Sequence, residues 1–203
     1  MNEKFFSLPE QKRQAIVNAG YRVFSQNAYK NSPMSQIAAE AGISKSLLFH
    51  YFRNKKELYL FLWDTCAKLT IRVLTDYGCY ERQELFVSME RGVRAKMELI
   101  RRYPDMARFT IRAFYEKDRE ICAAIQDSYH RYFNLKADRA RVDLDPEQFV
   151  PGLDVPMMYR EMYWASEGYL WEMVQRGDAD MERMEKDFTR LIAFWKSVYL
   201  RKE

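Results

Sequence analysis

The order of apolar and polar residues predicts helices along almost the whole chain. Between residues 16 and 24 apolar side chains recur at steps of three and four, as they do on one face of an α-helix. Residues 181–199 show the same period. Its members are Met181, Met184, Phe188, Leu191, Ile192, Trp195 and Tyr199. Such segments add up to about nine helices with few breaks, so the pattern predicts an all-α fold.

Short polar side chains mark where several of these helices should begin, because such residues accept hydrogen bonds from the free N–H groups of a first turn. The first helix should end near residue 27, and a later one should run from about 116 to 136. The expected capping residues are Ser7 with Glu10 three positions on, Ser32 followed by Pro33, Ser44, and Asn54 with Glu57.

Composition agrees with a helical, globular protein and excludes several classes of site. Only 7 Gly and 6 Pro occur in 203 residues, and 48% of the residues are apolar, enough for a core in one or two domains. Two His, and three Cys without C-x-x-C spacing, argue against a metal site, and no cofactor is expected. The cysteine usage and the absence of a signal-peptide core suggest a cytoplasmic protein. The longest charge-free apolar run, residues 58–63, is too short to cross a membrane.

Charge is distributed unevenly along the chain. The net charge is +4, yet residues 1–60 hold nine Lys and Arg against four Glu, and the remaining residues are close to neutral. This asymmetry predicts a small basic module that could meet a polyanion, attached to a neutral body with another role.

Residues 32–52 have the spacing of a helix-turn-helix. The small Ala38 allows two helices to cross closely, Gly42 turns the chain, and Ile43 and Leu48 close the joint. In the second of these helices Leu48 and Phe52 should pack inward. The outer face would then be free to enter a DNA major groove.

The run from residue 37 to residue 58 resembles the signature of TetR-family transcriptional regulators. Residues Ala15, Ile16, Ala19 and Phe24 match that family's first helix. Ser46, Phe49 and Ala28 depart from its commonest residues. The resemblance implies a helix-turn-helix DNA-binding domain over residues 1–54, joined to a larger helical ligand-binding and dimerisation domain over residues 55–203.

The resemblance also assigns roles at the predicted DNA surface. Base edges should be contacted by Lys45, Ser46, Leu47 and Phe49, and phosphates by His50, Tyr51 and Lys55. Hydroxyls of the capping residues Ser32 and Ser44 are further candidates for phosphate contacts, as donors at helix N-termini are.

The last two helices and the middle of the chain carry the other predicted sites. Two subunits should pair through a four-helix bundle, with Ala165, Gly168, Tyr169, Phe188, Leu191 and Trp195 at the interface. A small-molecule chamber could be lined by Trp63, Met97, Phe109, Arg112, Phe114, Tyr115, Tyr159 and Met162. Met and aromatic residues at helical spacing fit a packed core as well, so both interpretations stay open.

Together these features predict a dimeric, ligand-responsive transcriptional regulator. We expect a repressor that binds a near-palindromic double-stranded operator and is released by a small apolar or aromatic molecule. An enzyme is disfavoured because no glycine-rich phosphate loop, H-E-x-x-H or G-x-S-x-G motif occurs. The alternative is a helical protein-interaction or small-molecule-binding module whose helix-turn-helix binds no DNA. Salt-dependent DNA binding would separate the two.

Overall fold

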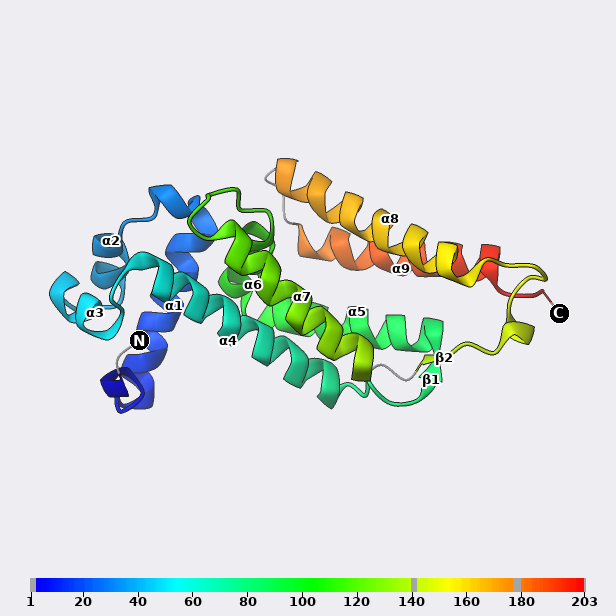
Figure 1. Ribbon diagram of the computed structural model, residues 1–203, viewed down its shortest axis with the longest axis horizontal. Helices are drawn as coiled ribbons and strands as arrows, with labels where there is room; N and C mark the ends of the chain where they lie inside the picture. Colours follow the sequence, from blue (N-terminus) through cyan, green and yellow to red (C-terminus); the bar gives the residue numbers. More distant parts are fainter. Residues whose placement is uncertain (1–2, 140–141, 177–179, 203) are drawn as a thin grey trace. The chain divides into compact units, whose positions relative to one another are not determined.

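The computed structural model describes residues 3–139, 142–176 and 180–202, and within them the chain is all-α, as predicted (Figure 1). The α-helices of this part are α1 (Glu10–Gln26), α2 (Met34–Glu40), α3 (Lys45–Tyr51), α4 (Lys55–Asp76), α5 (Leu85–Arg102), α6 (Pro104–Phe114), α7 (Cys122–Arg139), α8 (Val155–Arg176) and α9 (Met181–Tyr199). The smaller elements are the 3-10 turns η1 (Glu3–Phe5), η2 (Tyr29–Asn31) and η3 (Pro146–Gln148), and the two-residue strands β1 (Gln83–Glu84) and β2 (Val142–Asp143). The strands pair in parallel, with Gln83 opposite Val142.

Two of the predicted caps are confirmed. The Ser44 hydroxyl accepts a hydrogen bond from the Leu47 N–H at 3.1 Å and so begins α3. The Asn54 side chain accepts from the Glu57 N–H at 2.8 Å, and the Glu57 carboxylate accepts from the Arg53 N–H at 2.7 Å. Both ends of this reciprocal arrangement stabilise the start of α4.

The other two predicted caps are wrong, since a proline occupies the capping position in each case. Pro9 and Pro33 are the N-cap residues of α1 and α2, with extended ψ angles of 140° and 138°, and neither helix has a side-chain cap. The predicted start of α7 at residue 116 is also wrong, because the helix begins at Cys122.

The chain forms two compact units that are discontinuous in sequence. Unit 1 comprises residues 1–70 and 102–135, and unit 2 comprises residues 71–101 and 136–203. Helices α4 and α7 therefore begin in one unit and end in the other. Helix α6 packs against α1 inside unit 1, so the units do not follow the expected boundary at residue 54, and a functional division at that point stays a prediction.

The core of unit 1 is rich in aromatic rings. Phe109 of α6 is fully buried and lies 5.3 Å from the ring of Tyr21 and 4.9 Å from that of Tyr59, measured between centroids. Helix α1 also lies very close to α4. The Tyr21 hydroxyl donates to the Leu62 carbonyl at 2.9 Å, and a Cβ at Gly20 would lie only 2.6 Å from a Leu62 methyl carbon.

The core of unit 2 lies between α5, α8 and α9. Met158 and Met162 of α8 pack with Ile192 and Trp195 of α9 and with Phe86 of α5. Polar contacts bind the same helices at the edge of this core. Lys196 lies 2.5 Å from Glu90, and the Tyr199 hydroxyl donates to Glu161 at 3.0 Å. Figure 1 shows α8 and α9 side by side along their length.

Candidate nucleic-acid interface

Helices α2 and α3 meet through a tight turn that depends on Gly42. This glycine has a φ of 68°, a conformation that residues with a Cβ rarely adopt. The next residue, Ile43, donates its N–H to the Ala38 carbonyl at 3.0 Å, which fixes the turn against α2. The predicted roles of small Ala38 and turning Gly42 fit this geometry, and the segment forms a helix-turn-helix.

Helix α3 presents one face to solvent and buries the other. Leu48 and the C-cap residue Phe52 are fully buried, which confirms that they belong to the core. The exposed side chains are Ser44, Lys45, Ser46, Leu47, Phe49 and His50. We call these six residues the α3 face. They include most of the residues predicted to reach DNA, brought together on one side of a short helix.

Local contacts order parts of the α3 face. The hydroxyls of Ser44 and Ser46 lie 3.0 Å apart, and the Lys45 ammonium lies 5.9 Å from the centre of the Phe49 ring. Leu47 and Phe49 are 37% and 39% exposed, so both present apolar surface to solvent. The face therefore offers hydroxyl groups, a cation and apolar surface together, the set of groups that reads base edges and thymine methyls.

Tyr51 does not belong to this face, contrary to prediction. Its side chain is buried, with the ring 6.0 Å from that of Phe5. Phe5 also lies 4.9 Å from Phe52 and 5.3 Å from Phe61, so η1 packs under α3 and α4. Sequence reasoning missed Phe5 as a core residue. Its only signal was an apolar pair just before the first helix.

Two more residues that were predicted to contact phosphates form hydrogen bonds within the protein instead. Ser32 is fully buried, and its hydroxyl donates to the Ala28 carbonyl at 3.0 Å. The Lys55 ammonium donates to the carbonyls of Tyr29 and Lys30 at 2.7 and 3.2 Å and lies 4.4 Å from the centre of the Tyr29 ring. Neither side chain has the free, exposed geometry that the prediction assumed.

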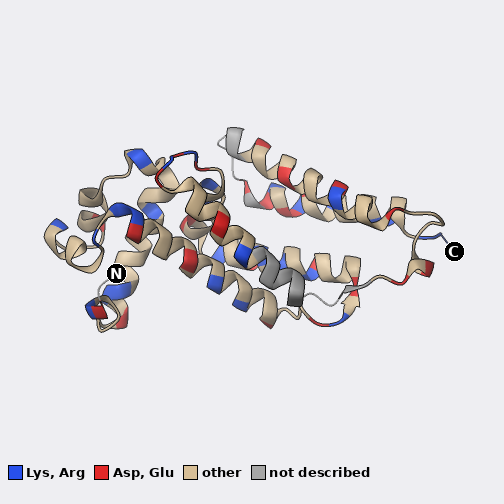
Figure 2. Ribbon diagram, viewed as in Figure 1, with Lys and Arg blue, Asp and Glu red and all other residues tan. Residues whose placement is uncertain are grey.

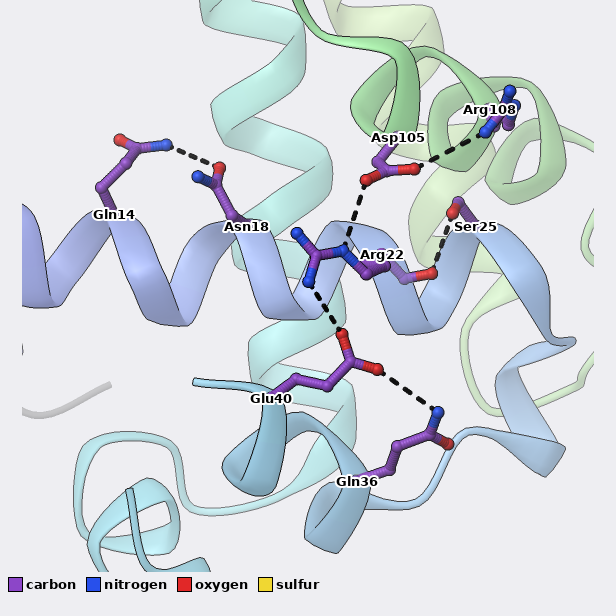
Figure 3. Close-up of polar contacts among 8 residues, drawn as sticks. All are labelled: Gln14, Asn18, Arg22, Ser25, Gln36, Glu40, Asp105 and Arg108. Atoms are coloured by element: carbon purple, nitrogen blue, oxygen red, sulfur yellow. Dashed lines mark hydrogen bonds and ion pairs between the residues drawn. The ribbon is translucent and has the colours of Figure 1, made fainter. Parts of the chain in front are cut away.

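Arg22 of α1 holds α2 from the side. Its guanidinium lies 3.4 Å from the Glu40 carboxylate at the end of α2 and 3.7 Å from Asp105 at the start of α6, as Figure 3 shows. Gln36 donates to the same Glu40 at 3.4 Å, and Arg108 approaches Asp105 at 3.7 Å. A carboxylate of the helix-turn-helix is thus linked through α1 to α6.

Three of the four acidic residues among residues 1–60 have partners within the protein. Of the four Glu in residues 1–60, Glu10 pairs with Arg13, Glu40 with Arg22, and Glu57 accepts a backbone N–H. Lys45 is exposed, so positive charge remains available on the α3 face. Figure 2 shows basic positions, in blue, on α3 and at the start of α4. Such a surface attracts a polyanion such as DNA.

The residues predicted to line a small-molecule chamber are divided between the two units. Trp63, Phe109, Arg112, Phe114 and Tyr115 belong to unit 1, and Met97, Tyr159 and Met162 belong to unit 2. Phe109 and Met162 are core residues of their units, and Tyr159 is 37% exposed on α8. The Arg112 Nε donates to the Ser25 carbonyl at 3.1 Å, so its guanidinium forms a hydrogen bond to the backbone of α1.

Within unit 1, two features remain compatible with binding an organic molecule. Phe114 lies 4.9 Å from the Tyr115 ring and 4.7 Å from that of Tyr129, which forms a half-buried aromatic group. The Trp63 indole N–H is buried and has no acceptor in the described part of the chain. A buried donor without a partner carries a free-energy cost that a ligand oxygen would relieve.

The predicted dimer residues mostly face the inside of the α8–α9 pair. Trp195 is 1% exposed and belongs to the core of unit 2, with Leu191 and Ala165 packed against it. The Tyr169 hydroxyl donates to Asp187 at 3.0 Å, and the Tyr169 ring lies 5.2 Å from that of Phe188. Gly168 is exposed. Trp195 in particular is already covered within one subunit.

Other apolar side chains of α8 and α9 are exposed instead. On α8, Met157, Trp164 and Trp171 follow one another at seven-residue spacing, two helical turns, so they share one face. They are 50%, 58% and 39% exposed, and Phe194 and Val198 of α9 are 57% and 43% exposed. We call these five residues the apolar face of unit 2.

No three His, Cys, Asp or Glu side chains of residues 3–139, 142–176 and 180–202 are grouped so as to hold a metal ion. None of the helices in these ranges is both long and apolar enough to span a membrane. Burial raises the pKa of the Tyr21 and Tyr59 hydroxyls well above the usual tyrosine value.

Comparison with known proteins gives one consistent result. The family described as "Bacterial regulatory proteins, tetR family" matches residues 16–61, which run from α1 into α4. The HTH-type transcriptional regulator RutR of Escherichia coli K12 is 30% identical over 97 residues, which are 48% of this chain and 45% of RutR. The chain therefore matches only about half the length of this curated relative.

Solved structures extend the likeness in fold to the whole chain. A TetR family transcriptional regulator from Chloroflexus aurantiacus superposes with a TM-score of 0.65 at 19% identity, covering 99% of both chains. The transcriptional regulator FadR from Bacillus subtilis, solved in complex with stearoyl-CoA, gives 0.60 at 17% identity over 88% of this chain and 96% of FadR. The helix-turn-helix, the family match over residues 16–61 and the fold of the whole chain agree, and all three support a TetR-family transcriptional regulator.

Proposed function

We propose that this chain regulates transcription by binding a specific DNA sequence through the α3 face. The observation that carries the proposal is the composition of that face, in which Lys45, Ser46, Leu47 and Phe49 point outward above a fully buried Leu48. A major groove accepts one helix, and these side chains offer both polar and apolar contacts to base edges. Because the operator is chromosomal DNA, the protein acts in the cytoplasm.

The test is selection of binding sites from a random duplex library, followed by anisotropy titration at several salt concentrations. The wild-type protein should enrich a near-palindrome, and log K should fall linearly with log salt. Lys45→Met should reduce that slope by about 0.9 for each subunit on the DNA, about 1.8 for a dimer, because each ammonium would neutralise one phosphate. Phe49→Ala should change the preferred base at one position of each half-site. Lys186→Met, at an exposed lysine of α9, is the control and should change neither. Salt-independent binding, or none, would favour the alternative of an interaction module that does not bind DNA.

We further propose that the active form is a homodimer built on the apolar face of unit 2. Exposed tryptophan, phenylalanine and methionine side chains on α8 and α9 are typical of an interface, since monomers rarely leave so many large apolar side chains in water. A dimer also supplies two α3 helices, which would read half-sites about 34 Å apart on one side of the DNA.

Sedimentation velocity tests the dimer. The wild-type protein should sediment as a dimer at micromolar concentration, and Trp164→Glu should convert it to a folded monomer, because a buried unpaired charge is strongly unfavourable at an interface. Tyr77→Glu, at a 38% exposed residue outside α8 and α9, should remain dimeric. A monomeric wild type, or a Trp164→Glu dimer of wild-type stability, would contradict this interface.

The effector we propose is a small molecule with an apolar body and a hydrogen-bond acceptor that reaches the Trp63 indole, and its binding releases DNA. Support comes from the buried Trp63 donor and from FadR, a neighbour in fold that binds stearoyl-CoA. We propose repression because an occupied operator blocks polymerase without further machinery.

Stearoyl-CoA is the first probe. If it dissociates the protein–DNA complex for wild type but not for Trp63→Phe, the effector is an acyl-CoA. If it has no effect, stearoyl-CoA is excluded, and native mass spectrometry of the purified protein should show which molecule it carries.

A further inference from the structure

The short connection between α1 and α2 is held by hydrogen bonds to side chains from two other parts of unit 1. The peptide N–H of Tyr29 donates to the Glu116 carboxylate at 2.9 Å, and the Tyr29 carbonyl accepts from the Lys55 ammonium at 2.7 Å. Glu116 lies in the turn between α6 and α7, and Lys55 is the first residue of α4. We call Tyr29, Lys55 and Glu116 the Tyr29 junction.

Further contacts make this junction well defined. The second Glu116 oxygen accepts the N–H groups of Lys117 and Asp118 at 2.9 and 3.1 Å, so the carboxylate is held by its own turn. The Tyr29 ring is 2% exposed and stands edge-on to Tyr59 of α4 at 5.2 Å. A loop that could have been mobile is therefore anchored by its backbone and its side chain.

The position of the junction in the chain gives it a consequence for the helix-turn-helix. Only Ser32 and Pro33 separate η2 from α2, and Ser32 is itself buried and bonded back to Ala28. A shift of Tyr29 is therefore passed to α2 almost directly, and α2 carries α3 through the tight Gly42 turn. The segment that leads into α2 is therefore held by α4, through Lys55, and by the α6–α7 turn, through Glu116.

We propose that Lys55 and Glu116 are positioning residues for DNA binding: together they fix the α1–α2 connection, and Lys55 does not act by neutralising a DNA phosphate. The inference rests on the proposed DNA-binding function. Two of the three ammonium protons of Lys55 are directed at backbone carbonyls, and its charge lies over the Tyr29 ring. Glu116 contributes from 61 residues farther along the chain, far in sequence from any residue that reads DNA.

The sign of the Glu116 effect separates positioning from simple electrostatics. Removing a negative charge from a DNA-binding protein favours binding by charge alone. Removing it from the junction weakens the grip on the Tyr29 N–H, because a carboxylate accepts a stronger hydrogen bond than an amide oxygen does. Glu116→Gln should therefore lower DNA affinity, although the protein becomes more positive.

The experiment measures DNA affinity against salt for the full-length protein, with a duplex selected from a random library by the wild type, or a mixed-sequence duplex if none is enriched. Lys55→Met and Glu116→Gln should each weaken binding about fivefold, a typical coupling between linked sites, with the slope of log K against log salt unchanged. The double variant should weaken it by less than the product of the two effects, because both residues act on Tyr29. Lys45→Met, which should reduce the slope, and Asp127→Asn, at an exposed carboxylate of α7, are the matched controls.

Hydrogen exchange of the free protein tests the junction without DNA. Lys55→Met and Glu116→Gln should speed exchange of the Tyr29 amide and its neighbours in residues 28–32, whereas Asp127→Asn should not. A slope lowered in Lys55→Met by about 0.9 for each subunit on the DNA, or a Glu116→Gln affinity equal to or above wild type, would overturn the proposal. Unchanged exchange in both variants would also overturn it. Failure of the wild type to bind any duplex would refute the DNA-binding function instead, and the exchange result would still decide whether the junction holds the loop.

Discussion

Substituting Tyr21 by phenylalanine should lower the stability of the protein at neutral pH and leave it nearly unchanged in alkali. The Tyr21 hydroxyl is buried and donates one hydrogen bond, to the Leu62 carbonyl at 2.9 Å. Its loss should cost about 1 kcal/mol in the free energy of unfolding, because phenylalanine fills the same space and the carbonyl keeps a second lone pair.

The alkaline behaviour follows from the raised pKa of the Tyr21 hydroxyl. Burial first, and the Cys66 thiol second, raise this pKa well above 10.0, its value in an unfolded chain. The folded state thus holds a proton that the unfolded state releases above pH 10. Stability from this group is complete below pH 10 and falls as pH rises toward the folded pKa, by about 0.8 kcal/mol at pH 10.5 and about 1.4 kcal/mol at pH 11.

Urea denaturation followed by circular dichroism at pH 8, 10.5 and 11 measures both effects. The gap between wild type and Tyr21→Phe should be about 1 kcal/mol at pH 8 and should close between about pH 10.5 and 11. Losses from other buried tyrosines occur in both proteins and cancel in the difference. Tyr77→Phe, at an exposed residue, should follow wild type throughout. A gap that stays constant from pH 8 to pH 11 would refute the reasoning.

Further predictions concern packing in unit 1. Phe5→Ala should destabilise the protein by about 3–5 kcal/mol in urea denaturation, because the ring is fully buried, whereas Phe6→Ala, at a 53% exposed residue, should cost far less. Gly20→Ala should lower the free energy of unfolding by about 1–3 kcal/mol, since the new methyl overlaps Leu62 of α4. Gly92→Ala should raise it by up to about 1 kcal/mol, since nothing lies within 4 Å of the new methyl and alanine favours a helix. Thermal melts that rank the two glycine variants in the opposite order would contradict this packing. Arg22→Ala should lower stability by at most about 1 kcal/mol and lose that effect at 1 M salt, because its ion pairs are half-exposed.

Features set by neighbours in sequence were predictable. Ser44 and Asn54 cap their helices because the bonded N–H groups lie only three residues away. Leu48 and Phe52 were assigned to the core from a four-residue spacing alone. The same local reasoning failed at Ser7 and Ser32, where each time a proline adopted extended backbone angles and took the capping position itself.

Contacts between distant segments explain what could not be predicted. Tyr51 has the position of a DNA-facing residue on α3, yet Phe5, 46 residues earlier, covers it. Lys55 looked free because its partners belong to a loop 25 residues before it, and Glu116 binds that loop from 87 residues away. No periodicity or spacing encodes such pairs, since each depends on how segments far apart in the sequence pack together.

The interleaved composition of unit 1 constrains how the protein emerges from the ribosome. Phe109, the ring at the centre of that unit, is synthesised long after Tyr21 and Tyr59, which it covers. The first 70 residues alone would leave this side of α1 open to water, so unit 1 completes its packing only when residues 102–135 have left the exit tunnel. A shortened gene ending after α4 would for the same reason yield an incomplete unit 1.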